Sequence, residues 1–322
     1  MRRVLAAVAI LSCTLASALA RAEDFPQRPI TLILPYAAGG VTDEVARLVA
    51  SRVSSDFGQP VVVENKPGGA GQIAANAVKQ APADGYTLFV GDIGTHAINA
   101  SLYSKLSYDP AKDFAPITEL VEMPHVLVVP ADSPFKTLRE LIEAARAQPA
   151  KLTYGSVGVG SGAHLLGEMM KAQADIDIVH APYRGSSQIV PDLIAGRIAT
   201  FFGAVGSMKP FIDDGKLRGL VITDKQRAPQ LPNIPTVIEA GMPDLQLKVW
   251  FGVLAPAATP SPIVDILNRE FVKALNETST KRRLIELGAN VVGNTPKQFS
   301  DVMAADTERL GQVVQKAGIR LD

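Results

Sequence analysis

Cysteine is almost absent from the 322-residue sequence. The only one, Cys13, lies in an apolar run over residues 4–20 that follows two arginines and ends at Ala20-Arg21-Ala22, a pattern typical of a signal peptide. The run is too short and too rich in alanine for a membrane span. We therefore predict cleavage after Ala22, which leaves residues 23–322 in the periplasm without a disulfide. Lipidation at Cys13 and an uncleaved anchor are the alternatives.

An excess of charge of either sign is missing too. Lysine and arginine number 32, as do aspartate and glutamate, and loss of the signal peptide with its three arginines leaves 29 basic residues and a net charge of −3. This balance favours neither a nucleic-acid partner nor a membrane surface. Aromatic residues make up only 6% of the chain, but 47% is hydrophobic, so the remaining 300 residues can bury an aliphatic core. That length fits one large or two medium domains.

Motifs for catalysis and metal binding are also missing. No Gly-x-Ser-x-Gly elbow occurs, and no cysteine nucleophile remains after cleavage. The histidines stand in four different segments without metal-ligand spacing, at His96, His125, His164 and His180. Residues 158–163 fit the glycine pattern of a dinucleotide fold, but Asp175 and Asp177 come too early for its acid, and Ser161 stands where a P-loop needs lysine. We predict no catalytic residue, metal or cofactor, with an exported α/β enzyme as an alternative.

What the sequence does contain is a repeated glycine-rich junction between a strand and a helix. The clearest example joins an apolar run at residues 30–34 to an amphipathic helix near Asp43, through Pro-Tyr-Ala-Ala-Gly-Gly-Val-Thr-Asp at residues 35–43. The first N–H groups of such a helix have no intrahelical partner and form an anion site that glycine lets a ligand approach. Similar junctions occur near residues 94–96, 155–164 and 183–186. The sequence therefore predicts several helix starts presented to one small anion.

Strand and helix patterns alternate along most of the chain, which predicts an α/β fold with mainly parallel sheets. The expected strands are residues 30–34, 61–64, 87–91, 125–129, 152–156, 176–180, 198–203, 217–223 and 247–254. The expected helices are residues 44–57, 72–80, 161–173, 187–195, 262–275 and 278–287, with others starting after Thr137, near Ser207 and after Thr295. Residues 103–124 are expected to form turns. Two alternating sets of similar size predict two lobes, joined by residues 125–129 and 247–254.

Six segments together resemble the Bug family, the extracytoplasmic solute receptors of tripartite tricarboxylate transporters. They are residues 35–43, Pro-Val-Val-Val-Glu-Asn-Lys-Pro-Gly at 60–68, Asp-Gly-Tyr-Thr-Leu at 84–88, Gly-Thr-His-Ala-Ile-Asn at 94–99, Val-His-Ala-Pro-Tyr-Arg-Gly at 179–185 and Trp-Phe-Gly at 250–252. The similarity runs from about residue 25 to residue 322. It implies a periplasmic binding protein of type II, with two lobes and a ligand in the cleft between them.

The resemblance also implies capture of a small organic carboxylate, whether a dicarboxylate, a tricarboxylate or an aromatic acid, and its delivery to membrane permease subunits. In the family, two loops of the first lobe hold a carboxylate with backbone N–H groups, often with ordered water. We expect a monomer with lobe 1 over residues 23–124 and 252–322 and lobe 2 over residues 125–251. The expected ligand-binding residues are Tyr36, Ala38, Gly39, Gly40, Thr42, Gly94, Thr95, His96, Asn99, Ser156, Gly160, Ser161, His164, Tyr183, Arg184, Gly203 and Ala204. A receptor that signals to a membrane sensor is the alternative.

Two positions depart from the family pattern. Val41 replaces the third glycine of the first junction, and we expect its side chain to narrow or reshape the pocket. Gly203 stands where many members carry an acid, which weakens the case for an ammonium-bearing ligand and favours a plain aliphatic or aromatic carboxylate. Contact of His96, His164 and Arg184 with the ligand stays open, because each histidine could equally be structural and Arg184 could form a surface salt bridge.

Overall fold

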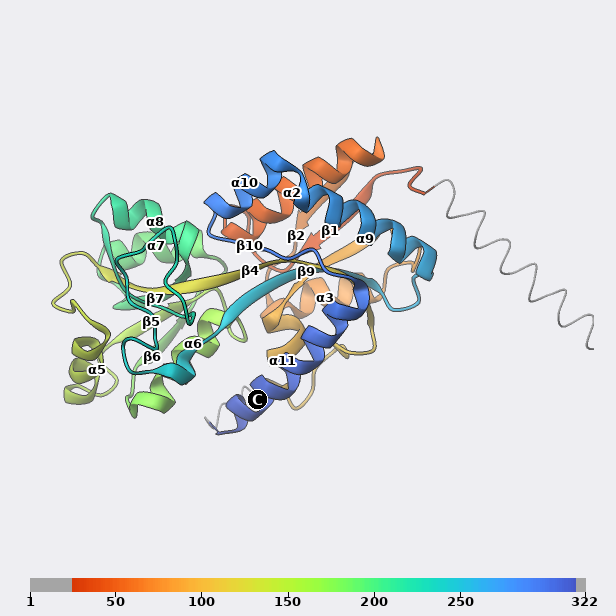
Figure 1. Ribbon diagram of the computed structural model, residues 1–322. Helices are drawn as coiled ribbons and strands as arrows, with labels where there is room; N and C mark the ends of the chain where they lie inside the picture. Colours follow the sequence, from red (N-terminus) through yellow and green to blue (C-terminus); the bar gives the residue numbers. More distant parts are fainter. Residues whose placement is uncertain (1–24, 317–322) are drawn as a thin grey trace, which may run out of the picture.

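The computed structural model of the protein describes residues 25–316. These residues form an α/β structure of two lobes joined by two long strands (Figure 1). The predicted fold class is therefore confirmed. The predicted signal peptide, residues 1–22, lies outside the described residues. Among the helices of residues 25–316, none is both long and apolar enough to cross a membrane.

The first lobe is built around the parallel strands β1 (Ile30–Leu34), β2 (Val61–Asn65) and β3 (Thr87–Asp92), in the order β2-β1-β3. Parallel neighbours need crossover connections, which α2 (Val41–Phe57) and α3 (Gln72–Lys79) supply. β1 is buried along nearly its whole length, as is typical of a strand covered on both faces. These elements were predicted, although α2 starts a little earlier than expected.

Two antiparallel strands, β4 (Phe114–Pro130) and β9 (Lys248–Pro256), run from one lobe into the other (Figure 1). β4 pairs with β9 as far as Pro124 and with the second-lobe strands from His125 onward. We call β4 and β9 the crossing strands. They were predicted as connections between the lobes.

The expectation of turns over residues 103–124 is wrong for residues 114–124, which belong to β4. Prolines in this stretch suggested turns, because proline cannot donate to a strand ladder. The register of β4 against β9 shifts beside Pro116, and a β-bulge of this kind is a place where a strand tolerates proline. The composition of residues 114–124 therefore did not predict this part of the strand.

The second lobe has its own sheet and helices. The strands are β5 (Thr153–Ser156), β6 (Val179–Pro182), β7 (Thr200–Ala204) and β8 (Leu217–Ile222), and the helices are α5 (Leu138–Ala147), α6 (Gly162–Ala174), α7 (Ser186–Ile194) and α8 (Val205–Asp213). β5 is parallel to β6 and β7. The strand expected at residues 176–180 starts later, at Val179, where pairing with β5 begins. Ile176 and Ile178 are apolar because they are buried, although they precede the strand.

The C-terminal part of the chain covers the first lobe. It consists of α9 (Ser261–Asn276), α10 (Thr278–Glu286), the short strand β10 (Asn290–Val291) and α11 (Pro296–Lys316). Shorter helical segments are η1 (Gly69–Gly71), η2 (Gly94–Ile98), α4 (Asn99–Leu102) and η3 (Pro243–Leu245). β10 pairs with β4, and α11 packs against η2 and β4. The C-terminal helices were predicted, whereas β10 was not.

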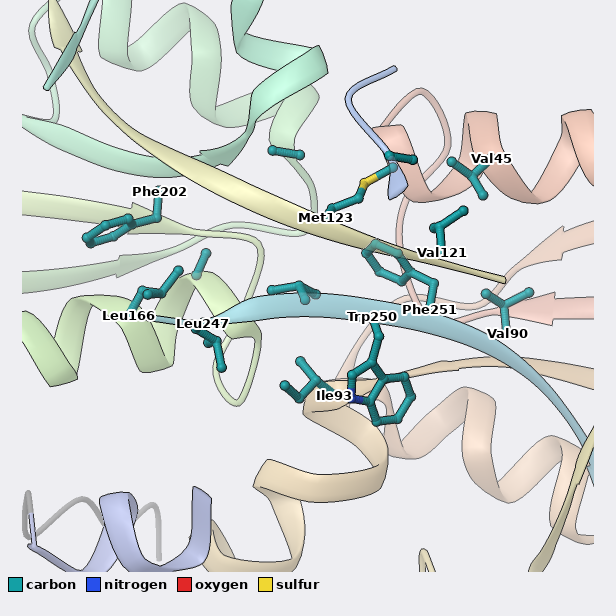
Figure 2. Close-up of a cluster of buried hydrophobic side chains, with 14 of the residues drawn as sticks. Val45, Val90, Ile93, Val121, Met123, Leu166, Phe202, Leu247, Trp250 and Phe251 are labelled. Atoms are coloured by element: carbon teal, nitrogen blue, oxygen red, sulfur yellow. The ribbon is translucent and has the colours of Figure 1, made fainter. Parts of the chain in front are cut away.

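A cluster of buried hydrophobic side chains surrounds the crossing strands (Figure 2). Val121 and Met123 of β4 lie near Trp250 and Phe251 of β9 in this cluster. The indole Nε1 of Trp250 donates to Asp306 Oδ2 of α11 at 2.8 Å. The crossing strands are therefore anchored to the first lobe next to the strand ends that carry the candidate site.

Candidate functional site

A cavity of about 240 Å³, called here the cleft cavity, lies between loops of the two lobes. The first lobe contributes loops that follow β1, β2 and β3, and the second lobe contributes loops that follow β5 and β6. The lining residues are Pro35, Tyr36, Gly68, Gly69, Ala70, Gly71, Asp92, Gly94, Thr95, Val157, Gly158, Val159, Gly160, Ser161, Tyr183 and Arg184. The carboxyl ends of parallel strands meet at one edge of a sheet, where α/β folds usually bind ligands.

All four glycine-rich junctions identified in the sequence converge on the cleft cavity. The predicted binding residues among its lining are Tyr36, Gly94, Thr95, Gly160, Ser161, Tyr183 and Arg184. The helices α2 and α7 begin at Gly40 and Gly185 without a side-chain cap. Their first N–H groups therefore have no side-chain acceptor, and the positive end of each helix dipole lies beside the cleft cavity, in the wall of a second, smaller cavity.

A smaller cavity of about 50 Å³ lies next to the cleft cavity and shares Tyr36 and Val157 with it. Its lining includes the predicted residues Gly40, Thr42 and Ala204. The remaining walls are largely apolar and include Val41, His125, Phe201, Phe202, Val249 and Phe251. Val41, which replaces the third glycine of the family pattern, therefore lies in the wall of this inner cavity.

Asp92, the last residue of β3, was not predicted as a site residue, but it is 1% exposed and lines the cleft cavity. The Tyr36 hydroxyl donates to Oδ2 of Asp92, and the N–H and hydroxyl of Thr95 donate to Oδ1 at 2.8 and 2.9 Å. Burial raises the pKa of Asp92, while these donors favour its ionised form. Burial also raises the pKa of Tyr36, with a further contribution from the charge of Asp92.

The loop Gly68–Gly71 lines the cleft cavity but was not predicted as part of the site. Gly68, Gly69, Ala70 and Gly71 all have positive φ, at 117°, 55°, 53° and 83°. Glycine adopts such angles at little cost, which explains why the loop is rich in glycine. The loop follows β2, which neighbours β1, so the shared edge of their carboxyl ends was a usable signal for its place in the site.

Two predicted residues, His96 of η2 and Asn99 at the start of α4, lie behind the lining of the cleft cavity. The ring of His96 packs against Phe89 and Phe114, with ring centroids 5.4 and 5.0 Å away, and burial lowers its pKa to about 3. Asn99 is fully buried, and its Nδ2 donates to the carbonyl of Ala70 at 2.8 Å. His96 therefore belongs to the aromatic core, and Asn99 supports the loop that lines the cavity.

Two more predicted residues, Ser156 and His164, support the loop between β5 and α6. His164 Nδ1 accepts the N–H of Gly160 at 3.3 Å, and its ring lies 4.3 Å from that of His180. Ser156 Oγ is 2.7 Å from His180 Nε2 and accepts the N–H of Gly158 at 3.1 Å. Burial lowers the pKa of both histidines to about 4, so they are neutral at pH 7. These side chains fix the loop from behind rather than lining the cavity.

The other predicted residues also lie away from the cleft cavity. Gly203 faces the interior of the second lobe and not the cleft, because a Cβ at this position would lie 2.5 Å from Met208 Cγ. Gly39 lines an outer groove between α2, α7, α8 and α10. Ala38 is exposed in the β1–α2 loop and lines neither the cleft cavity nor the inner cavity.

The two lobes touch across the cleft. The N–H of Ala37 donates to the carbonyl of Arg184 at 3.4 Å. A Cβ on Gly94 would lie 2.7 Å from the carbonyl oxygen of Gly160, and one on Gly40 would lie 3.3 Å from Ser186 Oγ. The glycines at these positions therefore allow the lobes to close on the cavity.

Arg184 is exposed at the edge of the cleft cavity. Its backbone N–H donates to Gln188, but its guanidinium forms no salt bridge with a carboxylate of residues 25–316. The surface salt bridge considered from the sequence is therefore not formed in the described part of the chain. The guanidinium remains available to a ligand.

The fold and the cleft define the class of two-lobe solute-binding receptors. The family model described as "Tripartite tricarboxylate transporter family receptor" matches residues 45–319. The chain belongs to this family, as its resemblance to the Bug proteins predicted. The protein BugT of Bordetella pertussis is 33% identical over 323 residues, which covers 100% of this chain and 99% of BugT.

Two solved structures from Rhodopseudomonas palustris are similar to this chain. Rpa4515 with adipate has 38% sequence identity and a TM-score of 0.88, and the match covers 92% of this chain and 100% of that one. MatC with bound malate has 34% identity and a TM-score of 0.87, and the match covers 90% and 100% of the two chains. The adipate and the malate of these two structures are both small carboxylates.

Proposed function

We propose that the protein is a periplasmic receptor that binds a small organic carboxylate in the cleft cavity and delivers it to the permease subunits of a tripartite tricarboxylate transporter. The observation that carries this proposal is the convergence of glycine-rich loops from both lobes on the cleft cavity, beside an inner cavity that is lined by the uncapped starts of α2 and α7. Burying a carboxylate is costly unless its oxygens are hydrogen-bonded. Backbone N–H groups at helix starts can supply those bonds. Similar proteins with adipate and malate support the ligand class.

Closure of the lobes is the proposed binding mechanism. Each lobe supplies part of the cavity wall, so only the closed state surrounds a ligand from both sides. Such a ligand binds the closed state more tightly and shifts the population towards it. The crossing strands are the natural hinge, because they join the lobes. A permease that recognises the closed form would then accept only loaded receptors.

The proposal includes the organisation of the whole chain. Lobe 1 would cover residues 23–124 and 252–322, and lobe 2 residues 125–251, a division supported by the change of partners of β4 at His125. The signal peptide would be cleaved after Ala22. The family's receptor role supports a protein without enzymatic activity that acts with a permease partner. We further propose that it needs no cofactor and acts as a monomer.

A thermal-shift screen of residues 23–322 tests the proposal. The panel contains carboxylates, amino acids, sugars and nucleotides. A ligand at about 100 times its Kd stabilises the folded state by about 2.7 kcal/mol, which raises the unfolding midpoint by a few degrees. We expect compounds that carry a carboxylate to raise it. Stabilisation by sugars or nucleotides alone would contradict the proposed ligand class.

A further inference from the structure

Asp92 places a buried acid in the wall of a cavity that is proposed to bind carboxylates. Its hydrogen-bond donors within residues 25–316 are the hydroxyl of Tyr36 and the N–H and hydroxyl of Thr95, and none of them carries a positive charge. Burial raises the pKa of Asp92, but these hydrogen bonds all donate to the carboxyl oxygens, so they favour its carboxylate form and leave that charge without a cationic partner. Because the side chain is 1% exposed, solvent does little to screen it from the cavity.

In its carboxylate form, Asp92 would distinguish the two ends of a ligand. Oδ2 of Asp92 accepts one bond from Tyr36, and a carboxylate oxygen can accept about two. A hydroxyl or ammonium hydrogen could therefore donate to it. A second carboxylate would bring no donor and would be repelled, because like charges interact strongly where water is excluded.

The opposite charge lies elsewhere in the same lining. Among the residues that line the cleft cavity, Arg184 is the only one with a positive charge and Asp92 the only acid. The two side chains both line the cavity and form no salt bridge with each other. The carboxylate of a ligand is attracted towards Arg184 and its other end lies towards Asp92.

This arrangement changes the expectation drawn from Gly203. The absence of an acid at position 203 favoured a plain carboxylate, on the assumption that residue 203 faces the ligand. Gly203 faces Met208 instead, and the acid of the cavity is supplied by the first lobe through Asp92.

We propose that Asp92 is a specificity-determining residue that selects an acid with a hydroxyl or ammonium group at its far end over a dicarboxylate of the same length. The proposal rests on the proposed function. It assigns to Asp92 the recognition of a hydrogen-bond donor and to Arg184, with the helix starts, the recognition of the carboxylate.

Calorimetric titration with matched ligands tests this assignment. The probes are succinate with its four-carbon hydroxy and amino counterparts, and glutarate and adipate with theirs, so that only the terminal group changes within a set. We expect the hydroxy or amino member of the best-binding set to bind about tenfold more tightly than the dicarboxylate, a difference of about 1.4 kcal/mol. Asp92→Asn keeps the shape and removes the charge, and should bring this ratio to about one. Asp213→Asn, which removes an exposed acid on α8, should leave the ratio unchanged.

The wild-type ranking can overturn the assignment without any variant. A dicarboxylate that binds as tightly as its counterparts in every set would do so, as would a folded Asp92→Asn variant with the wild-type ratio. Binding of none of these acids, together with no stabilisation by any carboxylate in the thermal-shift panel, would instead contradict the proposed function itself. The two failures are therefore distinguishable.

Discussion

Two charged side chains set the electrostatics of the cleft cavity. Asp92 is buried and held by Tyr36 and Thr95, whereas Arg184 is exposed at the edge. An exposed guanidinium interacts with a carboxylate through water and salt, so its contribution is modest and depends on ionic strength. In the proposed receptor, Arg184 therefore attracts a carboxylate, while the buried groups decide which one fits.

The substitution Arg184→Gln should weaken binding of every carboxylate ligand by about 1 kcal/mol, or roughly fivefold, at low salt. The loss should shrink as salt is added, because added ions screen exposed charges. Titrations at two salt concentrations measure both effects. Arg282→Gln removes an equally exposed charge from α10, away from the cleft cavity, and should leave affinity unchanged. Equal losses in the two variants would mean that Arg184 acts only through net charge.

Glu119 of β4 is a second buried acid, outside the cavities described above. It is 1% exposed, and Oε2 accepts Asn294 Nδ2 at 3.0 Å, while Oε1 has no hydrogen-bond partner among residues 25–316. Burial, followed by the charge of Glu122, raises the pKa of Glu119 from 4.5 to about 7. Because the folded state holds this proton more tightly than the unfolded state, stability falls as the pH rises from about 4.5 to about 7.

From pH 5 to pH 8 we expect Glu119 to lower the free energy of unfolding by about 2 to 3 kcal/mol. Glu119→Gln should remove this part of the pH dependence, since the amide does not titrate. Urea denaturation of both proteins at the two pH values measures it. Glu143→Gln, on the exposed face of α5, serves as the control. If Glu119→Gln and the wild type lose the same stability between these pH values, the carboxyl group does not titrate as described.

Several elements could be predicted because local signals determine them. β1 follows from an apolar run, and α5 from the capping box at Thr137. The first half of β4 could not be predicted, because it is held by pairing with β9, which lies far away in the sequence. The irregular register of this pairing accommodates Pro116. β10 spans only two residues and exists through its pairing with β4, so it has no pattern of its own.

The site was predictable at the level of loops and less so at the level of side chains. The strand-to-helix junctions converge as expected, because parallel strands place their carboxyl ends together. Within η2, however, neighbouring side chains point in different directions around the helix. Thr95 thus contacts Asp92, whereas the adjacent His96 faces Phe89 and Phe114. Which residue lines the cavity is set by tertiary packing that the sequence pattern does not contain.

The capping box of α5 provides a test at the scale of an element. Thr137→Ala removes the hydroxyl that accepts the N–H of Glu140, and should lower the free energy of unfolding by about 1 kcal/mol. Thr137→Ser keeps the hydroxyl and should cost much less. Urea denaturation compares the two variants with the wild type. Equal losses in both would show that the methyl group of Thr137, and not its cap, provides the stabilisation.

At the scale of the whole molecule, the proposed mechanism depends on how closely the lobes approach. The first lobe carries Gly94, and the second carries Gly160, whose carbonyl oxygen leaves no room for a Cβ on Gly94. Gly40 approaches only the hydroxyl of Ser186, a side chain that can rotate away. Gly94 and Gly40 both lie at the cleft, but only Gly94 faces rigid backbone. A substitution at Gly94 should therefore block closure, whereas the same substitution at Gly40 should change the cleft surface only mildly.

Calorimetric titration of wild type, Gly94→Ala and Gly40→Ala with the tightest carboxylate tests the central claim most directly. We predict that Gly94→Ala weakens binding by about 1 to 3 kcal/mol, because the added methyl group opposes closure. Its unfolding midpoint without ligand should fall only slightly, since the open form relieves the contact with Gly160 and leaves only the milder approach of 3.2 Å to Asp92 Oδ1. Gly40→Ala should lose clearly less affinity. Wild-type affinity in a folded Gly94→Ala protein would contradict the account, because the carboxylate would then bind somewhere other than the closed cleft.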